Sequence, residues 1–318
     1  MSANELLKVE NLKKYFQTPN GTLHAVDDIS FTLNKGTTLG VVGESGCGKS
    51  TLGRTILKLH EPTSGKIIFE GEDISNYKPK QMKALRKDMQ IIFQDPFASL
   101  NPRMTVGQTI EESLLIQKTI DKRDKKAIEK RVSEVMDLVG IAPRLVNSYP
   151  HELDGGRRQR VGIGRVLAIN PKFIVCDEPV SALDVSIRAQ VLNLMQDLQK
   201  QFGFTYLFIT HDLSVVKHLS DEIIVMYLGK IVEKAPAKEL FINPKHPYTK
   251  ALLSAIPVPD PDYKAQRIIL EGELTSPIDP KPGCRFANRC PYATEQCRCG
   301  DIPLKQVSEN HLVACNLI

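Results

Sequence analysis

One glycine-rich segment limits the fold of this 318-residue chain more than any other feature. Residues 43–50 read GESGCGKS, and they lie between an apolar run ending at Val42 and a helical pattern from Thr51 to Arg54. A G-x-x-x-x-G-K-S pattern between a strand and a helix binds phosphates, whereas an ordinary glycine-rich turn lacks those flanks. A dinucleotide-binding fingerprint would place its glycines at other offsets. The segment therefore predicts a phosphate-binding P-loop.

Each residue type in this loop has a physical role. Glycines let the backbone curl so that successive N–H groups point at phosphate oxygens, and the helix N-terminus adds a partial positive charge. We expect Lys49 to neutralise the β and γ phosphates of a nucleotide and Ser50 to ligate Mg²⁺. The predicted phosphate contacts are Gly43, Glu44, Ser45, Gly46, Cys47, Gly48, Lys49, Ser50 and Thr51.

Short apolar runs predict the sheets. The early runs, separated by Gly and Asn turns, are typical of hairpin strands and cover residues 23–26, 38–42 and 66–69. Three later runs are too short for helices and are separated by helical pattern; they cover residues 173–176, 205–209 and 223–226. Strands that are apolar on both faces indicate a parallel sheet covered by helices. The expected fold class is α/β, with a parallel core sheet and an antiparallel β subdomain.

Two further regions have different patterns. A helical period begins near Thr105 and predicts a helical subdomain at about residues 103–160. Its basic run at residues 121–126 is either a docking surface or a solvated helix face, and the second interpretation is favoured. After His246 prolines are frequent, which predicts irregular loops rather than more sheet and a domain boundary there. The predicted domains are residues 5–245 and a C-terminal extension at 246–318.

Composition limits the compartment and the partners. The chain is 42% hydrophobic and 25% charged, and no apolar stretch approaches the roughly 18 residues of a membrane-spanning helix. Its N-terminus has neither a basic start nor an apolar signal core, so we expect a cytoplasmic protein whose role at a membrane requires a partner. A net charge of +5 suits an anionic ligand, but it is too small to indicate nucleic acid, and no nucleic acid is expected.

A pair of acids follows one of the later strands. Asp177 and Glu178 come directly after residues 173–176, and the carboxyl ends of parallel strands face the ligand crevice. We expect Asp177 to hold Mg²⁺ through water and Glu178 to polarise the attacking water, a general-base role worth roughly 10²–10⁴-fold in rate. An isolated acidic pair is usually a solvated strand end, but together with the P-loop it indicates hydrolysis.

At this point the chain resembles the nucleotide-binding subunits of ATP-binding cassette transporters, because several further motifs follow in that family's order. Gln94 stands where the Q-loop glutamine does, His211 where the switch histidine does, and Tyr15 or Phe16 where an aromatic ring stacks on adenine. Residues 153–160, LDGGRRQR, occupy the signature position, and residues 181–184, SALD, resemble the D-loop. The resemblance implies a P-loop NTPase cassette that binds MgATP, with Mg²⁺ near Ser50, Gln94 and Asp177.

The same resemblance implies a dimer. Two subunits of this family close head to tail, so that each ATP lies between one chain's P-loop and the other chain's signature. The expected catalytic residues are Lys49, Gln94, Glu178 and His211, and the expected contacts to the partner's nucleotide are Asp154, Gly155, Gly156 and Asp184. Two transmembrane permease subunits complete the expected assembly at the cytoplasmic face of the membrane.

The signature departs from the family's usual Leu-Ser-Gly-Gly-Gln. Asp154 replaces the serine whose hydroxyl donates to the γ-phosphate, and Arg157 replaces the glutamine. A carboxylate facing a phosphate at 4 Å costs about 1 to 4 kcal/mol for effective dielectrics between 80 and 20, and Arg157 offsets part of that. We therefore expect one weakened ATP site, in a heterodimer with a homologous ATPase that has an intact signature.

Five cysteines crowd the C-terminal extension: Cys284, Cys290, Cys297, Cys299 and Cys315. Their spacing matches neither a zinc ribbon nor the common ferredoxin run, so the residues alone leave zinc, an iron–sulfur cluster and free thiols open. Residues 246–253 (HPYTKALL) and the segments around Cys284 and Cys290 resemble the extension of dipeptide/oligopeptide importer ATPases, particularly the second of their paired subunits. That resemblance implies a 4Fe–4S cluster on Cys284, Cys290, Cys297 and Cys315, with zinc as the alternative and Cys299 unassigned.

The expected function is the ATPase of a di- or oligopeptide importer, supplied by an external peptide-binding protein. An importer of another small solute such as nickel is the nearest competing function, because this chain does not touch the cargo. Two further functions compete less strongly: a soluble cassette ATPase acting on nucleic acid, and a regulator that binds nucleotide without hydrolysis. The former would normally have two cassettes or a coiled-coil insertion, and Glu178 and His211 argue against the latter.

Overall fold

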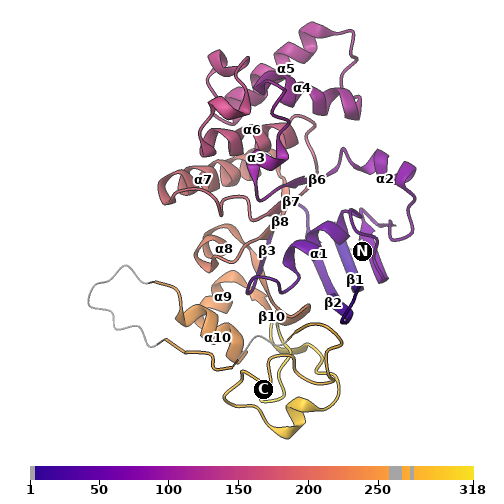
Figure 1. The fold of residues 1–318 in the computed structure, drawn as a ribbon, viewed down its shortest axis with the longest axis vertical. Helices are drawn as coiled ribbons and strands as arrows, with labels where there is room; N and C mark the ends of the chain where they lie inside the picture. The colour runs from indigo at the N-terminus through magenta and orange to yellow at the C-terminus, as the bar shows by residue number, and fades with distance from the viewer. Residues whose placement is uncertain (1–3, 258–266, 273–275) are drawn as a thin grey trace. The chain divides into compact units, whose positions relative to one another are not determined.

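A computed structural model describes residues 4–257, 267–272 and 276–318 (Figure 1). The chain forms two compact units. The P-loop unit comprises the chain up to Asn76 and from Phe208 onward, and the signature unit comprises Tyr77–Leu207. The strand β8 (Thr205–Ile209), buried throughout, carries the chain from the signature unit into the P-loop unit.

The first sheet of the P-loop unit is antiparallel and has the strand order β2-β1-β4-β5. Its strands are β1 (Glu5–Thr18), β2 (Gly21–Asn34), β4 (Ser64–Phe69) and β5 (Glu72–Asp73). The two long strands pair over their whole length, from Glu5 opposite Asn34 to Thr18 opposite Gly21, with several register shifts. The antiparallel β subdomain expected from the early apolar runs is therefore confirmed.

The second sheet of the P-loop unit carries the phosphate loop. Its order within this unit is β11-β12-β10-β9-β3, and its strands are β3 (Thr38–Val42), β9 (Glu222–Tyr227), β10 (Lys230–Pro236), β11 (Lys305–Ser308) and β12 (His311–Val313). β3 pairs with β9 in parallel, with Val42 opposite Val225, and all five residues of β3 are buried. The sequence grouped residues 38–42 with the hairpin strands, and that assignment is wrong, because this strand pairs in parallel with β9, which begins only at Glu222, far later in the chain.

The C-terminal extension differs from the prediction in one respect. The sequence predicted loops without further strands, but β12 pairs antiparallel with β10 and β11 pairs with β12. The two strands have four and three residues, too few for a period-two pattern to be distinguishable from a loop. In Figure 1 the yellow C-terminal segment lies beside β10 and α10.

Short helices complete the P-loop unit. They are α1 (Lys49–Ile56), α8 (Leu213–Leu219), α9 (Ala237–Ile242) and α10 (Pro247–Ser254), with the 3₁₀ turn η3 (Glu295–Arg298) in the extension. α1 packs against β1 and β2, α8 packs against β3, and α9 packs against β9 and β10. Leu52, Ile56 and Leu240 are fully buried, as expected for the apolar faces of amphipathic helices.

The signature unit is mostly helical. Its parallel strands β6 (Met89–Ile92) and β7 (Phe173–Asp177) pair side by side. Its helices are α2 (Pro79–Leu85), α3 (Pro96–Ser99), α4 (Val106–Gln117), α5 (Lys125–Leu138), α6 (Gly155–Leu167) and α7 (Val185–Phe202), with the 3₁₀ turns η1 (Pro143–Leu145) and η2 (Pro150–Glu152). α6 contacts α3, α4, α5 and α7, so the predicted helical region is built around the helix that follows the signature.

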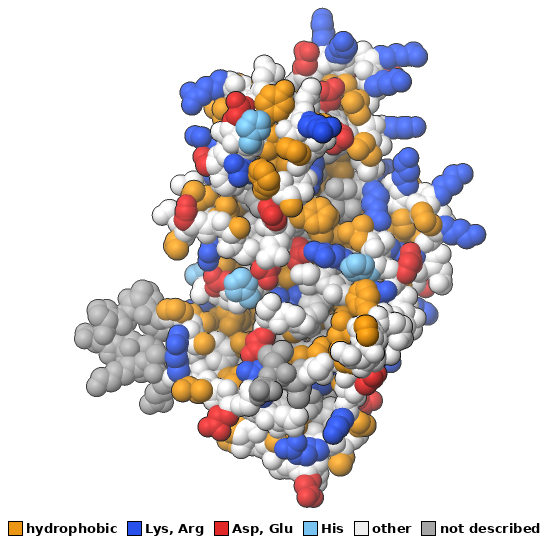
Figure 2. Space-filling view, viewed as in Figure 1, with side chains coloured by type: hydrophobic (Ala, Val, Ile, Leu, Met, Phe, Trp, Pro, Cys, Tyr) orange, Lys and Arg blue, Asp and Glu red, His pale blue; other side chains and the backbone are white. Residues whose placement is uncertain are grey.

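The basic run of the helical region is solvated. Lys122, Arg123, Lys125 and Lys126 are exposed at the start of α5, whereas Ile128 and Val132 on the same helix are buried. Figure 2 shows Lys and Arg side chains projecting from the part of this unit formed by α4 and α5. Lys122 and Arg123 lie just before α5, and exposure of the run is expected for either interpretation, so the solvated helix face stays a prediction. Among the described residues no helix is both long enough and apolar enough to span a membrane.

Candidate nucleotide-binding site

The P-loop joins the end of β3 to the start of α1 through three glycines with positive φ. Gly43, Gly46 and Gly48 have φ of 153°, 77° and 103°, which only glycine adopts without strain. A Cβ atom on Gly48 would lie 1.9 Å from the carbonyl oxygen of Ala25, so the backbone approaches too closely for any side chain. Gly48 is also the N-cap of α1, and it has no side chain with which to cap the helix. Because no side chain caps it, the N-terminus of α1 is suited to binding an external anion.

Lys49 is the first residue of α1 and is almost fully buried. Its Nζ donates to the carbonyl oxygens of Gly43 and Glu44, at 2.8 and 2.9 Å, so the ammonium lies over its own loop. The buried thiol of Cys47 lies 3.8 Å away, and burial raises the pKa of this thiol, which keeps it protonated. Lys49 is positioned to place a positive charge at a phosphate held by the loop.

The two aromatic candidates on β1 have different partners. Tyr15 stacks on His24 with ring centroids 3.9 Å apart, and its hydroxyl donates to Asp27 at 2.5 Å. Burial and this carboxylate raise the pKa of the Tyr15 hydroxyl. Phe16 is half-buried and meets His60 edge-on. The Phe16 ring also has Lys14 Nζ 4.6 Å from its centre, so both aromatic rings have internal contacts and both stay candidates for stacking on an adenine ring.

The switch-histidine position follows β8 in the P-loop unit. His211 is exposed, and the preceding Thr210 donates its backbone N–H to the carbonyl oxygen of Val41, one residue before the end of β3. Asp212 caps α8 by accepting from the backbone N–H of Ser214 at 2.9 Å. His211 is therefore held at the carboxyl end of its strand, between a strand bond and a helix cap.

The acids and the Q-loop glutamine meet within the signature unit. Asp177 is buried at the end of β7, and Glu178 follows it with φ of 48°, a left-handed conformation unusual for a residue with a side chain. Gln94 Nε2 donates to Glu178 Oε2 at 3.1 Å, and Ser181 Oγ donates to the Glu178 carbonyl oxygen at 3.1 Å. Two residues 84 positions apart are thus brought into contact at the end of a buried strand.

The signature loop forms the N-terminus of α6. Asp154 is its N-cap and accepts from the backbone N–H of Arg157 at 2.7 Å, while the Arg157 guanidinium lies 3.2 Å from the same carboxylate. Both side chains are about half exposed. A Cβ atom on Gly156 would lie 2.5 Å from the Ile187 side chain, so α7 requires a glycine here. The Asp154 carboxylate is not isolated, because a helix N-terminus and a cation already stabilise it.

The signature helix is also tied to the segment after Gln94. Arg165 donates to the Ser99 carbonyl oxygen at 2.6 Å, and the Arg158 guanidinium lies 5.1 Å from the centre of the Phe97 ring. The D-loop residue Asp184 is exposed and is the N-cap residue of α7, although its side chain makes no capping bond. Within this unit the signature helix α6 is therefore in direct contact with the segment that follows the Q-loop glutamine.

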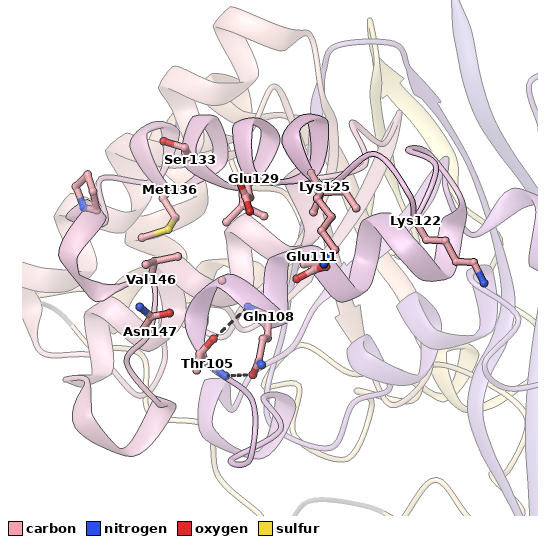
Figure 3. A pocket seen from close by; sticks show the side chains of 14 residues that line it. Thr105, Gln108, Glu111, Lys122, Lys125, Glu129, Ser133, Met136, Val146 and Asn147 are labelled. Carbon is pink, nitrogen blue, oxygen red and sulfur yellow. Dashed lines mark hydrogen bonds between the residues drawn. The ribbon is translucent and has the colours of Figure 1, made fainter.

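A pocket of about 560 Å³ lies elsewhere in the signature unit, between α4, α5 and η1. Figure 3 shows Met136 and Val146 close together at one end of it and Lys122 at the other. Thr105 and Gln108 form a capping box at the start of α4, with hydrogen bonds of 2.9 and 3.3 Å. No predicted nucleotide contact lines this pocket.

The cysteines of the extension separate into four and one. Cys297 and Cys315 are buried and Cys284 and Cys290 half-buried, whereas Cys299 is exposed. The pKa of the Cys284 thiol is raised to about 11, by burial first and by the thiols of Cys290, Cys297 and Cys315 as well. Four thiols therefore lie near one another. In the described part of the chain, however, no three His, Cys, Asp or Glu side chains converge closely enough to share one metal ion.

Comparison with known proteins agrees with this geometry. Residues 26–181 match the family described as "ABC transporter", and residues 232–297 match "Oligopeptide/dipeptide transporter, C-terminal region". The chain is 50% identical to the oligopeptide transport ATP-binding protein AppF of Bacillus subtilis, over 98% of this chain and 97% of that protein. It is also 50% identical to OppF of Escherichia coli strain K12, over 97% of this chain and 92% of OppF.

Solved structures show the same fold. A dimeric post-hydrolysis state of the cassette MJ0796, bound to ADP and phosphate, superposes with a TM-score of 0.67 at 26% identity, covering 73% of this chain and 99% of that one. CbiO1 of Clostridium perfringens, part of the transporter complex cbiONQ, gives a TM-score of 0.67 at 31% identity, covering 76% and 92% of the two chains.

The fold and the loops at its strand ends define an ATP-binding cassette ATPase, and the chain belongs to the ABC transporter family. The expected α/β cassette fold is confirmed. Within the family the chain belongs to the ATPases that have the oligopeptide/dipeptide transporter C-terminal region. Its cofactors are ATP and Mg²⁺, as its family implies.

Proposed function

We propose that this chain binds and hydrolyses MgATP to power the uptake of di- or oligopeptides through a membrane permease. The observation that carries the proposal is the preformed phosphate cradle at residues 43–50, with Lys49 buried over it, in a chain that also has the peptide-transporter C-terminal region. The names of AppF and OppF, at 50% identity, supply the class of cargo. An importer of another small solute remains the competing function.

In this proposal each site residue has one role. Ser50, Asp177 and Gln94 hold Mg²⁺, Lys49 neutralises the β and γ phosphates, and Tyr15 or Phe16 stacks on adenine. Glu178 polarises the attacking water, and its contact with Gln94 keeps its carboxylate at the strand end until nucleotide arrives. His211 contacts the γ-phosphate. Asp154, Gly155, Gly156 and Asp184 face the nucleotide of the partner ATPase.

The partner ATPase is a homologous chain with an intact signature, and the two together with two permease subunits work at the cytoplasmic face of the membrane. The support for an unequal pair is the Asp154 carboxylate in place of a serine hydroxyl. Because Arg157 and the N-terminus of α6 already stabilise this carboxylate, its repulsion of a phosphate is smaller than for a lone charge. The site that uses this signature is weakened rather than abolished.

The four neighbouring cysteines are proposed to hold a 4Fe–4S cluster. A single zinc ion needs four ligands converging at about 2.3 Å, whereas a cubane cluster binds its thiolates at four separated iron corners. The support for a cluster is the match of this extension to the peptide-transporter C-terminal region, together with the burial or half-burial of these four thiols and the exposure of Cys299. Such a cluster would supply a rigid cross-link or an electron-accepting group to the extension.

Uptake into proteoliposomes tests the proposal. This chain, its partner ATPase and the permease subunits, with the external binding protein, should accumulate a labelled oligopeptide only when MgATP is present at the ATPase side. Accumulation of Ni²⁺ instead of peptide would identify the competing importer. ATPase activity stimulated by nucleic acid in the absence of permease subunits would overturn the transport function altogether. Iron and sulfide analysis of anaerobically purified chain, with Cys299→Ser as the matched control for Cys284→Ser, tests the cluster.

A further inference from the structure

An arginine of the C-terminal extension contacts the P-loop directly. Arg289 Nη1 donates to both carboxylate oxygens of Glu44, at 2.8 and 3.1 Å, and to the hydroxyl of Tyr227 at 3.4 Å. The Arg289 side chain is only 11% exposed and the Glu44 side chain 25%. The two residues are 245 positions apart, so the contact exists only because the extension folds back onto the cassette.

A second contact from the extension holds the same residue. Tyr248, fully buried at the start of α10, accepts the backbone N–H of Glu44 at its hydroxyl, at 2.9 Å. Tyr248 packs edge-on against Tyr227, with ring centroids 4.7 Å apart, and Phe286 lies 5.3 Å from both rings. This aromatic cluster is rigid because its members are buried and in mutual contact. Both the backbone and the side chain of Glu44 are therefore fixed by residues outside the P-loop.

The other end of the P-loop is fixed in a related way. Arg285 is buried and donates to the carbonyl oxygen of Leu228 and to the Asp27 carboxylate. The next residue, Gly229, donates its backbone N–H to the Cys47 carbonyl oxygen at 2.8 Å. The turn that Arg285 holds thus supports the P-loop at Cys47, while Arg289 supports it at Glu44.

Charge gives the Arg289 contact a specific consequence. Glu44 is the second residue of a loop that binds a polyanion, and an unpaired carboxylate there repels phosphate. The Arg289 guanidinium neutralises that carboxylate, and its Nη1 holds both carboxylate oxygens and the Tyr227 hydroxyl at once, which fixes the direction of the Glu44 side chain. The charge of Lys49 neutralises the nucleotide phosphates, whereas the charge of Arg289 neutralises the Glu44 carboxylate.

We propose that Arg289 is a positioning residue for MgATP binding, which acts by neutralising and holding Glu44 of the P-loop. The cysteine-rich extension is then part of the nucleotide-binding machinery rather than an appendage. Arg289 does not contact the reacting atoms, so its loss should change the KM for MgATP and not the kcat.

The test is a double-mutant cycle on the full-length chain in its assembly. Arg289→Ala should raise the KM for MgATP about tenfold, as expected for a hydrogen-bonded ion pair, with kcat within about twofold. Arg289→Lys should recover only part of this loss. Glu44→Gln in the Arg289→Ala background should return KM to within about threefold of wild type, because it removes the unpaired charge. Arg298→Ala, an exposed arginine of the same extension that donates to Asn288, is the matched control and should leave KM unchanged.

Each outcome decides the proposal. An unchanged KM in folded Arg289→Ala, or a loss confined to kcat, overturns it. A double variant as weak as Arg289→Ala also overturns it, since the effect would then not act through Glu44. If Arg289→Ala fails to fold, the neutral variants Arg289→Gln and Glu44→Gln/Arg289→Gln complete the same cycle, with binding of a fluorescent ATP analogue in Mg²⁺ as the readout.

Discussion

Two glycine-rich helix starts in this protein look alike in sequence and differ in structure. α1 begins after Gly48, which has no side chain, and its loop is held open by contacts from outside. α6 begins after Asp154, whose carboxylate caps its own helix and pairs with Arg157. A helix N-terminus binds an anion only while its own cap does not occupy it. The N-terminus of α1 is therefore suited to binding phosphate, whereas the N-terminal N–H groups of α6 are partly capped by its own Asp154.

The largest effect should come from removing the charge at the open helix start. Lys49→Ala should lower kcat/KM for ATP hydrolysis by on the order of 10²-fold or more, because the phosphates lose their nearest buried cation. Phosphate release by this chain assembled without its partner ATPase measures this, because every site in that assembly uses the same P-loop. Lys238→Ala, an exposed lysine of α9 in the same unit, is the control and should have no effect. A Lys49→Ala enzyme with wild-type turnover would mean that the open start is not a phosphate site.

The N-terminus of α10 extends the comparison of helix caps, because its N-cap residue is a histidine, which titrates. His246 is buried, its Nδ1 accepts from the backbone N–H of Tyr248 at 3.1 Å, and burial lowers its pKa to about 4. The unfolded chain takes up this proton near pH 6.5 and the folded chain only near pH 4, so stability contributed by the neutral ring is lost as the pH falls between these values. The loss is on the order of 3 kcal/mol, since one pKa unit corresponds to about 1.4 kcal/mol.

His246→Asn tests this cap. Asparagine retains an acceptor for the helix start but does not titrate, so thermal unfolding of the variant should depend less on pH between about 6.5 and 4. His218→Asn replaces an exposed histidine and should keep the wild-type dependence. The same pH dependence in His246→Asn and wild type would contradict the assignment of the cap.

A smaller effect on ATP turnover is expected from a substitution at Asp154, which caps the N-terminus of α6. Asp154→Ser should raise ATP turnover of this chain assembled without its partner ATPase by about five- to tenfold, because one negative charge leaves the signature while serine still caps α6. Asp154→Asn removes the same charge without supplying a hydroxyl. A gain with serine and none with asparagine would show that the hydroxyl, not the charge, limits this site. Unchanged turnover in both would contradict the weakened signature.

Local sequence patterns predicted several structural elements of this protein. The P-loop, the buried strand at 38–42 and the helical region around α6 follow from residues that are neighbours in sequence. Contacts between distant segments could not be predicted in the same way: Arg289 with Glu44, Tyr248 with Glu44, and β12 with β10 depend on how the extension folds back. The Asp154 cap was predictable, because an acid at an N-cap three residues before Arg157 is a local signal.

Tyr15 and Phe16 show the same limit. Both are aromatic and adjacent, and only the structure shows that Tyr15 contacts His24 and Asp27 whereas Phe16 contacts His60 and Lys14. For the five cysteines, the resemblance to peptide-importer ATPases had already set Cys299 apart, and the structure adds that its thiol is the exposed one. Sequence identified the candidates here, and the structure shows the surroundings of each.

The most direct test of hydrolysis at this P-loop is phosphate release by the complete transporter with Glu178→Gln in this chain. The substitution keeps the contact with Gln94 possible but removes the base that polarises water. We predict that MgATP still binds with wild-type affinity while phosphate release falls to the residual turnover of the weakened site that uses this chain's signature, with Glu112→Gln on α4 unaffected. Phosphate release equal to wild type would show that hydrolysis does not depend on Glu178, and the assignment of this chain as a hydrolytic subunit through that residue would be wrong.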